Sequence, residues 1–200
     1  MVAIIDYGMG NVASVQKALN FLKIESAITS DPELIEKSDV IILPGVGSFL
    51  QGMKNLKSKG LDVLLTDQVL NKKKKFLGIC LGMQLLAEAG TEPNDNPGLG
   101  WIKGKVKKIE NIPFRIPHMG WNNINVKIDK YYSQINEKDF YFIHSYHFVP
   151  SNSEVIAATT NYGIEIVASI QQDNIFATQF HPEKSQEAGL TLLRNFFNNA

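Results

Sequence analysis

Cysteine is almost absent from this chain: its 200 residues include only one, Cys80. A single cysteine cannot form an internal disulfide, and it cannot build a metal cluster held by thiolates. Such a composition suits a reducing compartment, where free thiols persist. We therefore expect a cytoplasmic protein without a disulfide framework and without a metal.

Long apolar runs and an excess of charge of either sign are also missing. The apolar run at residues 2–5 is far shorter than the core of a signal peptide, and no run approaches the length of a membrane-spanning helix. Twenty Lys and Arg balance twenty Asp and Glu, so no overall field favours nucleic acid or an anionic membrane. With 44% hydrophobic residues, the composition is typical of a soluble globular protein, and we expect one domain over residues 1–200.

Strands and helices alternate in the first half of the chain. Short apolar runs are followed by segments with helical spacing, and these predicted strands cover 2–6, 24–29, 39–43 and 76–79. This rhythm predicts a flavodoxin-like α/β fold of three layers, with a mostly parallel sheet and helices on both faces. Ligands bind at the carboxyl ends of the strands in such sheets, so the loops at 7–11, 44–48 and 80 are candidates for a site.

The second half of the chain is rich in strands. Six apolar runs follow one another at hairpin intervals without helices between them, at 101–108, 122–128, 140–148, 155–159, 164–171 and 175–179. This pattern predicts a partly antiparallel arrangement. A last helix is expected from Ser185 to about Asn198.

Cys80 lies where a predicted strand gives way to a segment with helical spacing, which extends to Ala89. Gly78 and Gly82 flank it, as in the sharp strand-to-helix turn that exposes a nucleophile. A helix start there would favour the thiolate, and the backbone N–H of Leu81 would face a developing oxyanion. The alternative is a small buried hydrophobic residue, which is what most lone cysteines are.

A thiolate nucleophile needs a base, and the base needs a group that orients it. His181 and Glu183 follow the last apolar run and, in an extended segment, would project to the same side. A structural ion pair is the alternative. The glycine loop Gly45-Val46-Gly47 is either a tight turn or a source of N–H groups for an oxyanion.

No cofactor is expected. The turn at residues 7–11 contains Gly-x-Gly, but no third glycine follows at the spacing of a dinucleotide site, and no phosphate-cradling loop is found. His144 and His147 are three residues apart on a predicted strand, so they would face opposite sides and form no metal pair.

Two motifs together resemble the class I, triad-type glutamine amidotransferases: Gly-Ile-Cys-Leu-Gly-Met-Gln at 78–84 and Gln-Phe-His-Pro-Glu-Lys-Ser at 179–185. The resemblance covers the whole chain. Four further motifs, at 6–11, 44–47, 118–122 and 144–146, resemble those family members that supply ammonia to a cyclase in histidine biosynthesis.

The resemblance implies hydrolysis of L-glutamine to glutamate and ammonia, without a cofactor. Cys80 would form a γ-glutamyl thioester, His181 would shuttle protons, and Glu183 would orient His181. The remaining implied substrate and oxyanion residues are Gly45, Val46, Gly47, Leu81, Gln84, Ser145 and Tyr146.

The implied partner is a cyclase subunit with a (β/α)₈ barrel, which receives the ammonia in a heterodimer. That cyclase makes imidazole glycerol phosphate and an aminoimidazole carboxamide ribotide. We expect it to dock on the face that carries Cys80, with contacts from Asn11, Trp121 and Lys184.

Three alternatives stay open at the level of sequence. The chain resembles, less well, glutaminase subunits of anthranilate or pyridoxal phosphate synthesis. It could also be a cysteine peptidase or γ-glutamyl hydrolase that acts alone. The third alternative is a catalytically silent scaffold that binds and regulates a partner.

Overall fold

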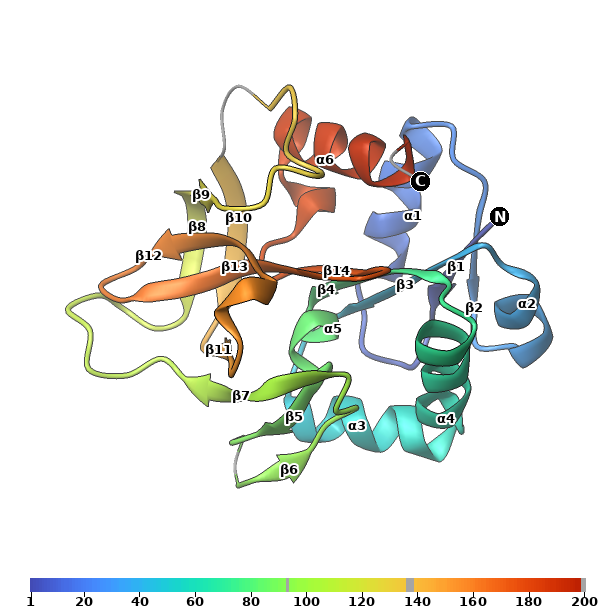
Figure 1. Ribbon diagram of the computed structural model, residues 1–200, viewed down its shortest axis with the longest axis horizontal. Helices are drawn as coiled ribbons and strands as arrows, with labels where there is room; N and C mark the ends of the chain where they lie inside the picture. Colours follow the sequence, from blue (N-terminus) through green and yellow to red (C-terminus); the bar gives the residue numbers. More distant parts are fainter. Residues whose placement is uncertain (93, 136–138, 199–200) are drawn as a thin grey trace.

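A mixed sheet runs through the centre of the molecule (Figure 1). The computed structural model describes residues 1–92, 94–135 and 139–198. Within them the central sheet has eight strands in the order β2-β1-β3-β4-β14-β13-β12-β9, and the first five run parallel. In chain order these strands are β1 (Val2–Ile5), β2 (Ser26–Thr29), β3 (Val40–Gly45), β4 (Lys75–Cys80), β9 (Asn125–Val126), β12 (Ile156–Asn161), β13 (Glu165–Gln172) and β14 (Ile175–Thr178).

Helices cover both faces of the sheet (Figure 1). One layer consists of α1 (Val12–Phe21) and α6 (Gln186–Asn198); the other contains α3 (Phe49–Ser58), α4 (Leu61–Thr66) and α5 (Leu81–Gln84). The remaining helical segments are α2 (Pro32–Lys37), η1 (Asp67–Asn71), η2 (Ser153–Val155) and η3 (Pro182–Lys184). The buried apolar side chains form one cluster on each face, so the predicted three-layer fold with a mostly parallel sheet is confirmed.

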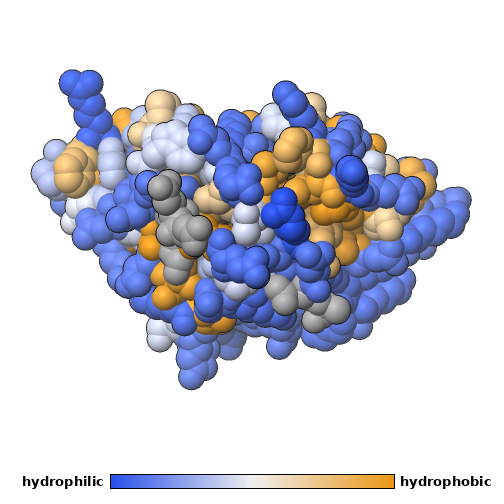
Figure 2. Space-filling view, turned by 90° about the horizontal axis from the view of Figure 1, so that it is seen from above, coloured by the Kyte–Doolittle hydropathy of each residue, from blue (hydrophilic) through white to orange (hydrophobic). Residues whose placement is uncertain are grey.

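Strand residues explain this layering. The β1 side chains are all buried, and Ile4 packs in one cluster while Ala3 and Ile5 pack in the other, because successive strand residues point to opposite faces. A strand buried on both faces needs a continuous apolar run rather than alternation, which is the pattern seen here. Viewed from the α1–α6 side, the surface is mainly hydrophilic, with a few hydrophobic areas between the charged side chains (Figure 2).

Two smaller sheets flank the central one. Four strands form the first, in the order β11-β7-β5-β6, with bounds β5 (Ala87–Gly90), β6 (Asn96–Pro97), β7 (Ile102–Lys108) and β11 (Tyr146–Pro150). The second is a two-stranded antiparallel ribbon of β8 (His118–Asn123) and β10 (Asp139–His144). The antiparallel character predicted for the second half of the chain is therefore present.

The prediction of a helix from Cys80 to Ala89 is wrong. Helix α5 makes a single turn and ends at Gln84, and β5 begins three residues later. Backbone bonds pull this segment into a sheet, since Gly98 N–H donates to Glu88 O at 2.9 Å and Gly100 N–H donates to Ala87 O at 3.0 Å. Leu85, Leu86 and Ala87 are all buried, and a continuous apolar run of this kind does not distinguish helix from strand.

The strands predicted at 140–148 and 122–128 also differ from the structure. A bend at Ser145 separates β10 from β11, and the two strands belong to different sheets. Strand β8 begins at His118 rather than at Asn122, and the short β9 follows it separately. The bend at Ser145 matters for the site, because it places the backbone of Tyr146 beside Gln84.

Candidate active site

Cys80 occupies the sharp turn between β4 and α5. Its backbone has φ 54° and ψ −107°, a conformation that residues other than glycine rarely adopt. Cys80 is buried, with 6% of its surface exposed. A Cβ added to Gly82 would lie 1.8 Å from the carbonyl oxygen of Leu43, so a larger residue cannot fit there. The turn predicted from the flanking glycines is therefore present, and it holds the thiol at the carboxyl end of the sheet.

His181 and Glu183 meet directly beyond the end of β14. The carboxylate Oε1 of Glu183 lies 2.7 Å from Nδ1 of His181, and both side chains are completely buried. The segment is not extended as predicted: the 3₁₀ turn η3 starts after His181 and folds Glu183 back onto the imidazole. Asn11 donates from Nδ2 to the same carboxylate oxygen, which fixes Glu183 from the other side.

The charges around His181 favour its protonated form. Burial acts to lower the pKa of His181, but the charge and proximity of Cys80, together with the hydrogen bond and charge of Glu183, outweigh it and raise the pKa to about 10. The arrangement therefore stabilises an imidazolium between a sulfur and a carboxylate. An imidazolium beside a cysteine sulfur is placed to act as a proton carrier for that nucleophile.

Two glutamines connect Cys80 to the bend at Ser145. Gln179 donates from Nε2 to Cys80 Sγ at 3.6 Å, while its Oε1 accepts from Gln84 Nε2 at 2.9 Å. Gln84 also donates to the carbonyl oxygen of Tyr146 at 2.9 Å. Gln179 was missed in the sequence analysis, although a polar residue at the end of an apolar strand, two positions before His181, is a signal that could have identified it.

The glycine loop lies next to Cys80, because Gly45 pairs with Cys80 in the parallel register of β3 and β4. Its Val46 N–H is engaged, donating to the carbonyl oxygen of Met9 at 2.8 Å. Gly47 has φ +109°, which a residue with a side chain would rarely adopt. In this conformation, therefore, the N–H of Val46 bonds within the protein and does not face the thiol site as a free donor.

Tyr7 lies beneath this loop. Its hydroxyl would be 2.1 Å from a Cβ placed on Gly45, so the glycine is required by close approach. The hydroxyl is buried without a hydrogen-bond partner among the described residues. Burial, followed by the charge of Cys80, raises the pKa of Tyr7 above its ordinary value, which places the phenol within the electrostatic reach of the thiol.

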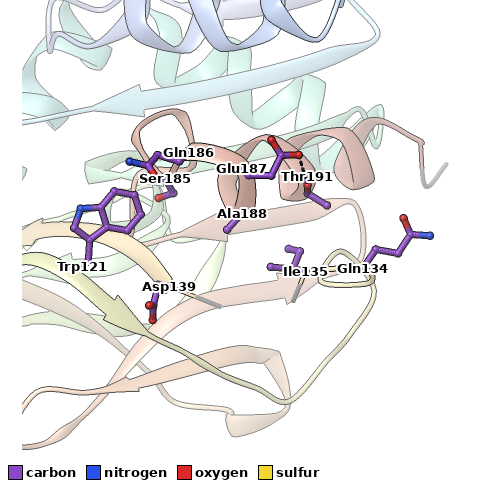
Figure 3. A pocket seen from close by; sticks show the side chains of 9 residues that line it. All are labelled: Trp121, Gln134, Ile135, Asp139, Ser185, Gln186, Glu187, Ala188 and Thr191. Carbon is purple, nitrogen blue, oxygen red and sulfur yellow. Dashed lines mark hydrogen bonds between the residues drawn. The ribbon is translucent and has the colours of Figure 1, made fainter. Parts of the chain in front are cut away.

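The three residues predicted to face a partner have different environments. Asn11 points inward to Glu183, whereas Trp121 is 49% exposed on β8 and Lys184 is exposed, with its Nζ 5.9 Å from the ring of Tyr141. A cavity of about 530 Å³ opens beside Trp121, between the start of α6 and the ribbon (Figure 3). It is lined by Trp121, Gln134, Ile135, Asp139, Ser185, Gln186, Glu187, Ala188 and Thr191.

In the described part of the chain, no group of three or more His, Cys, Asp or Glu side chains is placed to hold a metal ion. None of the described helices is long and apolar enough to span a membrane.

Residues 3–200 match the family model described as Glutamine amidotransferase class-I, and the chain therefore belongs to that family. Among curated proteins, it is 51% identical to imidazole glycerol phosphate synthase subunit HisH 1 of Campylobacter jejuni subsp. jejuni serotype O:23/36 (strain 81-176), over 98% of both chains. It is 48% identical to subunit HisH of the same synthase from Pyrococcus furiosus, over 98% of this chain and 97% of that protein. A crystal structure of a glutamine amidotransferase shares the fold, with a TM-score of 0.78 at 22% identity and coverage of 99% and 98%.

Proposed function

We propose that this chain is the glutaminase subunit of an imidazole glycerol phosphate synthase. It hydrolyses L-glutamine to glutamate and ammonia and passes the ammonia to a cyclase subunit in histidine biosynthesis. The observation that carries the proposal is the placement of Cys80 on a strained turn beside the buried His181–Glu183 pair. The family match and the names of the curated relatives support it.

Cys80, His181 and Glu183 have distinct roles in this reaction. The sulfur of Cys80 attacks the side-chain carboxamide carbon of glutamine, and the C–N bond breaks as His181 gives its proton to the leaving ammonia. His181 then takes a proton from water, which attacks the γ-glutamyl thioester and releases glutamate with the thiolate. Glu183 holds the imidazole in position and stabilises its charged form through the 2.7 Å contact.

Backbone N–H groups stabilise the negative oxygen that forms during the attack. Leu81 is next to Cys80 in the turn, and its N–H supplies one donor. The second comes from the loop Gly45-Val46-Gly47 after a peptide rotation, because Val46 N–H is bonded to Met9 O in the structure. Because this donor is engaged, we expect low activity before the partner binds.

Gln84, Ser145 and Tyr146 form the wall that receives the amino-acid end of glutamine. A hydrogen bond of 2.9 Å joins Gln84 to the Tyr146 carbonyl and fixes the two residues relative to each other. Ser145 lies at the bend between β10 and β11, directly before Tyr146. The three residues position the substrate while Cys80 reacts.

A cyclase subunit is the proposed partner, with a (β/α)₈ barrel that conducts ammonia and a heterodimeric arrangement. Ammonia released into water is protonated and ceases to be a nucleophile, so direct transfer is required. Trp121 and Lys184 are exposed near the His181 segment and supply contacts, and the cavity beside Trp121 receives a side chain of the partner. Asn11 contributes at the same face of the molecule by donating a hydrogen bond to Glu183. We place the complex in the cytoplasm.

Active-site labelling tests this function. A glutamine analogue with an electrophilic carbon in place of the side-chain amide should add one equivalent to Cys80, detected by peptide mass spectrometry in the complex with the cyclase. Excess L-glutamine should protect the thiol, whereas L-asparagine should not. Modification that glutamine does not slow would contradict a glutamine site at Cys80.

A further inference from the structure

The ribbon of β8 and β10 carries two buried histidines as direct cross-strand partners, His118 and His144. The ring of His118 stacks between Phe142, at a centroid distance of 4.7 Å, and Tyr162, at 4.0 Å. Neither histidine belongs to the triad. Two buried imidazoles facing each other need a defined arrangement of protons, because an unpaired nitrogen in the interior is costly.

The hydrogen bonds of the pair fix its protons. Nδ1 of His144 lies 2.9 Å from the carbonyl oxygen of Tyr146, which only accepts, so this nitrogen carries the proton. Nε2 of His144 must then accept, and Nδ1 of His118 donates to it at 3.0 Å. Nε2 of His118 is left to accept from Nδ2 of Asn122 at 3.3 Å. Both imidazoles are neutral, in agreement with burial, which lowers the pKa of His118 to about 4 and of His144 to about 3.

The chain of hydrogen bonds continues from this pair to the thiol. The carbonyl oxygen of Tyr146 receives a second hydrogen bond, from Gln84, and Gln84 bonds to Gln179, which donates to Cys80 Sγ. An unbroken series of hydrogen bonds, through side chains and the Tyr146 backbone carbonyl, therefore joins Asn122 on β8 to the nucleophile. Each group in this series has one orientation that satisfies the hydrogen bonds of its neighbours. Displacement of Asn122 therefore alters the hydrogen bonding of Cys80.

Strand β10 also contacts the triad through its backbone. The carbonyl oxygen of Tyr141 accepts from the N–H of His181 at 2.9 Å, and the carbonyl oxygen of Ile143 lies 3.9 Å from Cys80 Sγ. On the opposite strand, Met119 is 57% exposed and Trp121 is 49% exposed. The ribbon thus exposes apolar side chains on β8, while the backbone of β10 contacts both His181 and Cys80.

We propose that His118 and His144 are positioning residues that couple strand β8 to the reactivity of Cys80. This inference rests on the proposed function, because it assigns the coupling to the face where the cyclase docks. The neutral pair transmits the position of Asn122 through the Tyr146 carbonyl and the two glutamines to the thiol. Contact of a partner with Met119 and Trp121 therefore changes the hydrogen bonding of the nucleophile.

Alkylation of Cys80 by iodoacetamide tests the coupling in the full-length chain, alone and in the complex, and Cys80 is the only cysteine. His118→Phe keeps a ring between Phe142 and Tyr162 but cannot donate to His144. It should slow alkylation about threefold to tenfold and lower kcat for glutamine in the complex by a similar factor. His118→Asn restores a donor near the Nδ1 position and should recover most of the rate.

Two further variants keep the test decisive. Asn122→Ala changes a half-buried residue with little risk to folding and should slow alkylation in the same direction, by a smaller factor. His147→Phe is the matched control, because His147 lies on β11 outside the chain of hydrogen bonds, and its alkylation rate should equal that of the unmodified protein. Thermal melting of each variant identifies loss of folded protein.

Unchanged alkylation in folded His118→Phe and Asn122→Ala would overturn the coupling, as would slowing that His118→Asn does not relieve. The alkylation readout does not require glutamine hydrolysis. Absence of ammonia release by the unmodified complex, with slowed alkylation in His118→Phe, would therefore overturn the proposed function and leave the coupling supported. Normal ammonia release by the unmodified complex, with unchanged alkylation in His118→Phe, would support the proposed function and overturn the coupling.

Discussion

Three side chains of different chemistry determine what the site can do. In the proposed reaction Cys80 supplies the sulfur and His181 carries the proton. In the structure Glu183 contacts His181 and also accepts a hydrogen bond from Asn11. The imidazole has no exposed edge, so its charge depends on these neighbours and not on solvent. This dependence makes the protonation of His181 a direct test of the geometry.

The imidazole of His181 should stay protonated well above neutral pH. With the pKa raised to about 10, its NMR chemical shifts should not titrate near pH 6.5, the ordinary histidine range. A raised pKa means that the folded chain binds this proton more tightly than the unfolded chain. Its contribution to stability is therefore complete below about pH 6.5 and is lost as the pH rises through about 10.

Cys80→Ala supplies the comparison for this titration. Removing the sulfur removes two of the causes that raise the pKa of His181, so the titration should move to lower pH. A His181 titration near pH 6.5 in the unmodified protein, or one unaffected by Cys80→Ala, would contradict the arrangement described.

Glu183→Gln keeps the size of the side chain but removes its charge. Without the carboxylate, the imidazolium loses its stabilising partner, and kcat for glutamine in the complex should fall about 10²- to 10⁴-fold. Steady-state ammonia release measures the effect. The matched control is Glu36→Gln, an exposed residue on α2, which should retain normal kcat. Equal activity of the two variants would exclude a role for Glu183.

At the scale of elements, the turn between β4 and α5 depends on close backbone contact. Gly82→Ala would drive a Cβ toward Leu43 O, 1.8 Å away, and should lower the free energy of unfolding by about 3 kcal/mol. Chemical denaturation measures the loss. Gly60→Ala, with no atom within 4 Å of the added Cβ, should cost only about 1 kcal/mol for its positive φ. Similar losses in both variants would contradict the importance of this contact.

Local patterns predicted the parallel half of the sheet well. Apolar runs and glycine turns placed β1, β3 and β4. Local patterns gave the wrong element after Gln84. There the apolar run forms strand β5, because its backbone pairs with residues 98–102. Long-range pairing of this kind leaves no mark in a short window of sequence.

The site was predictable in part. Cys80, His181 and Glu183 were identified from motif spacing, and the structure brings them together, although their roles stay predictions. The argument from an extended His181–Glu183 segment was wrong, because a 3₁₀ turn makes the contact. Gln179, Tyr7 and the inward orientation of Asn11 were missed, since hydrogen bonding between separate strands cannot be derived from either strand alone. One domain over residues 1–200 also stays a prediction.

At the scale of the whole molecule, the reactive face and the exposed aromatic of β8 lie on neighbouring elements. Trp121→Ala combined with Lys184→Glu should raise the Kd for the cyclase about 10- to 100-fold, because one change removes an anchor and the other reverses a charge. Calorimetric titration measures it. The matched control is Val63→Ala with Lys57→Glu, which alters an exposed apolar residue and an exposed lysine on α4 and α3. An unchanged Kd in the first variant would exclude this face as the interface.

Ammonia release from L-glutamine tests the central claim most directly. The purified chain should release little ammonia alone, because Val46 N–H is held by Met9, and much more with the cyclase subunit and its ribonucleotide substrate. Cys80→Ala should abolish release in both settings, a loss of at least about 10⁴-fold. Release that persists in Cys80→Ala, or no release from the unmodified complex, would contradict a cysteine-dependent glutaminase.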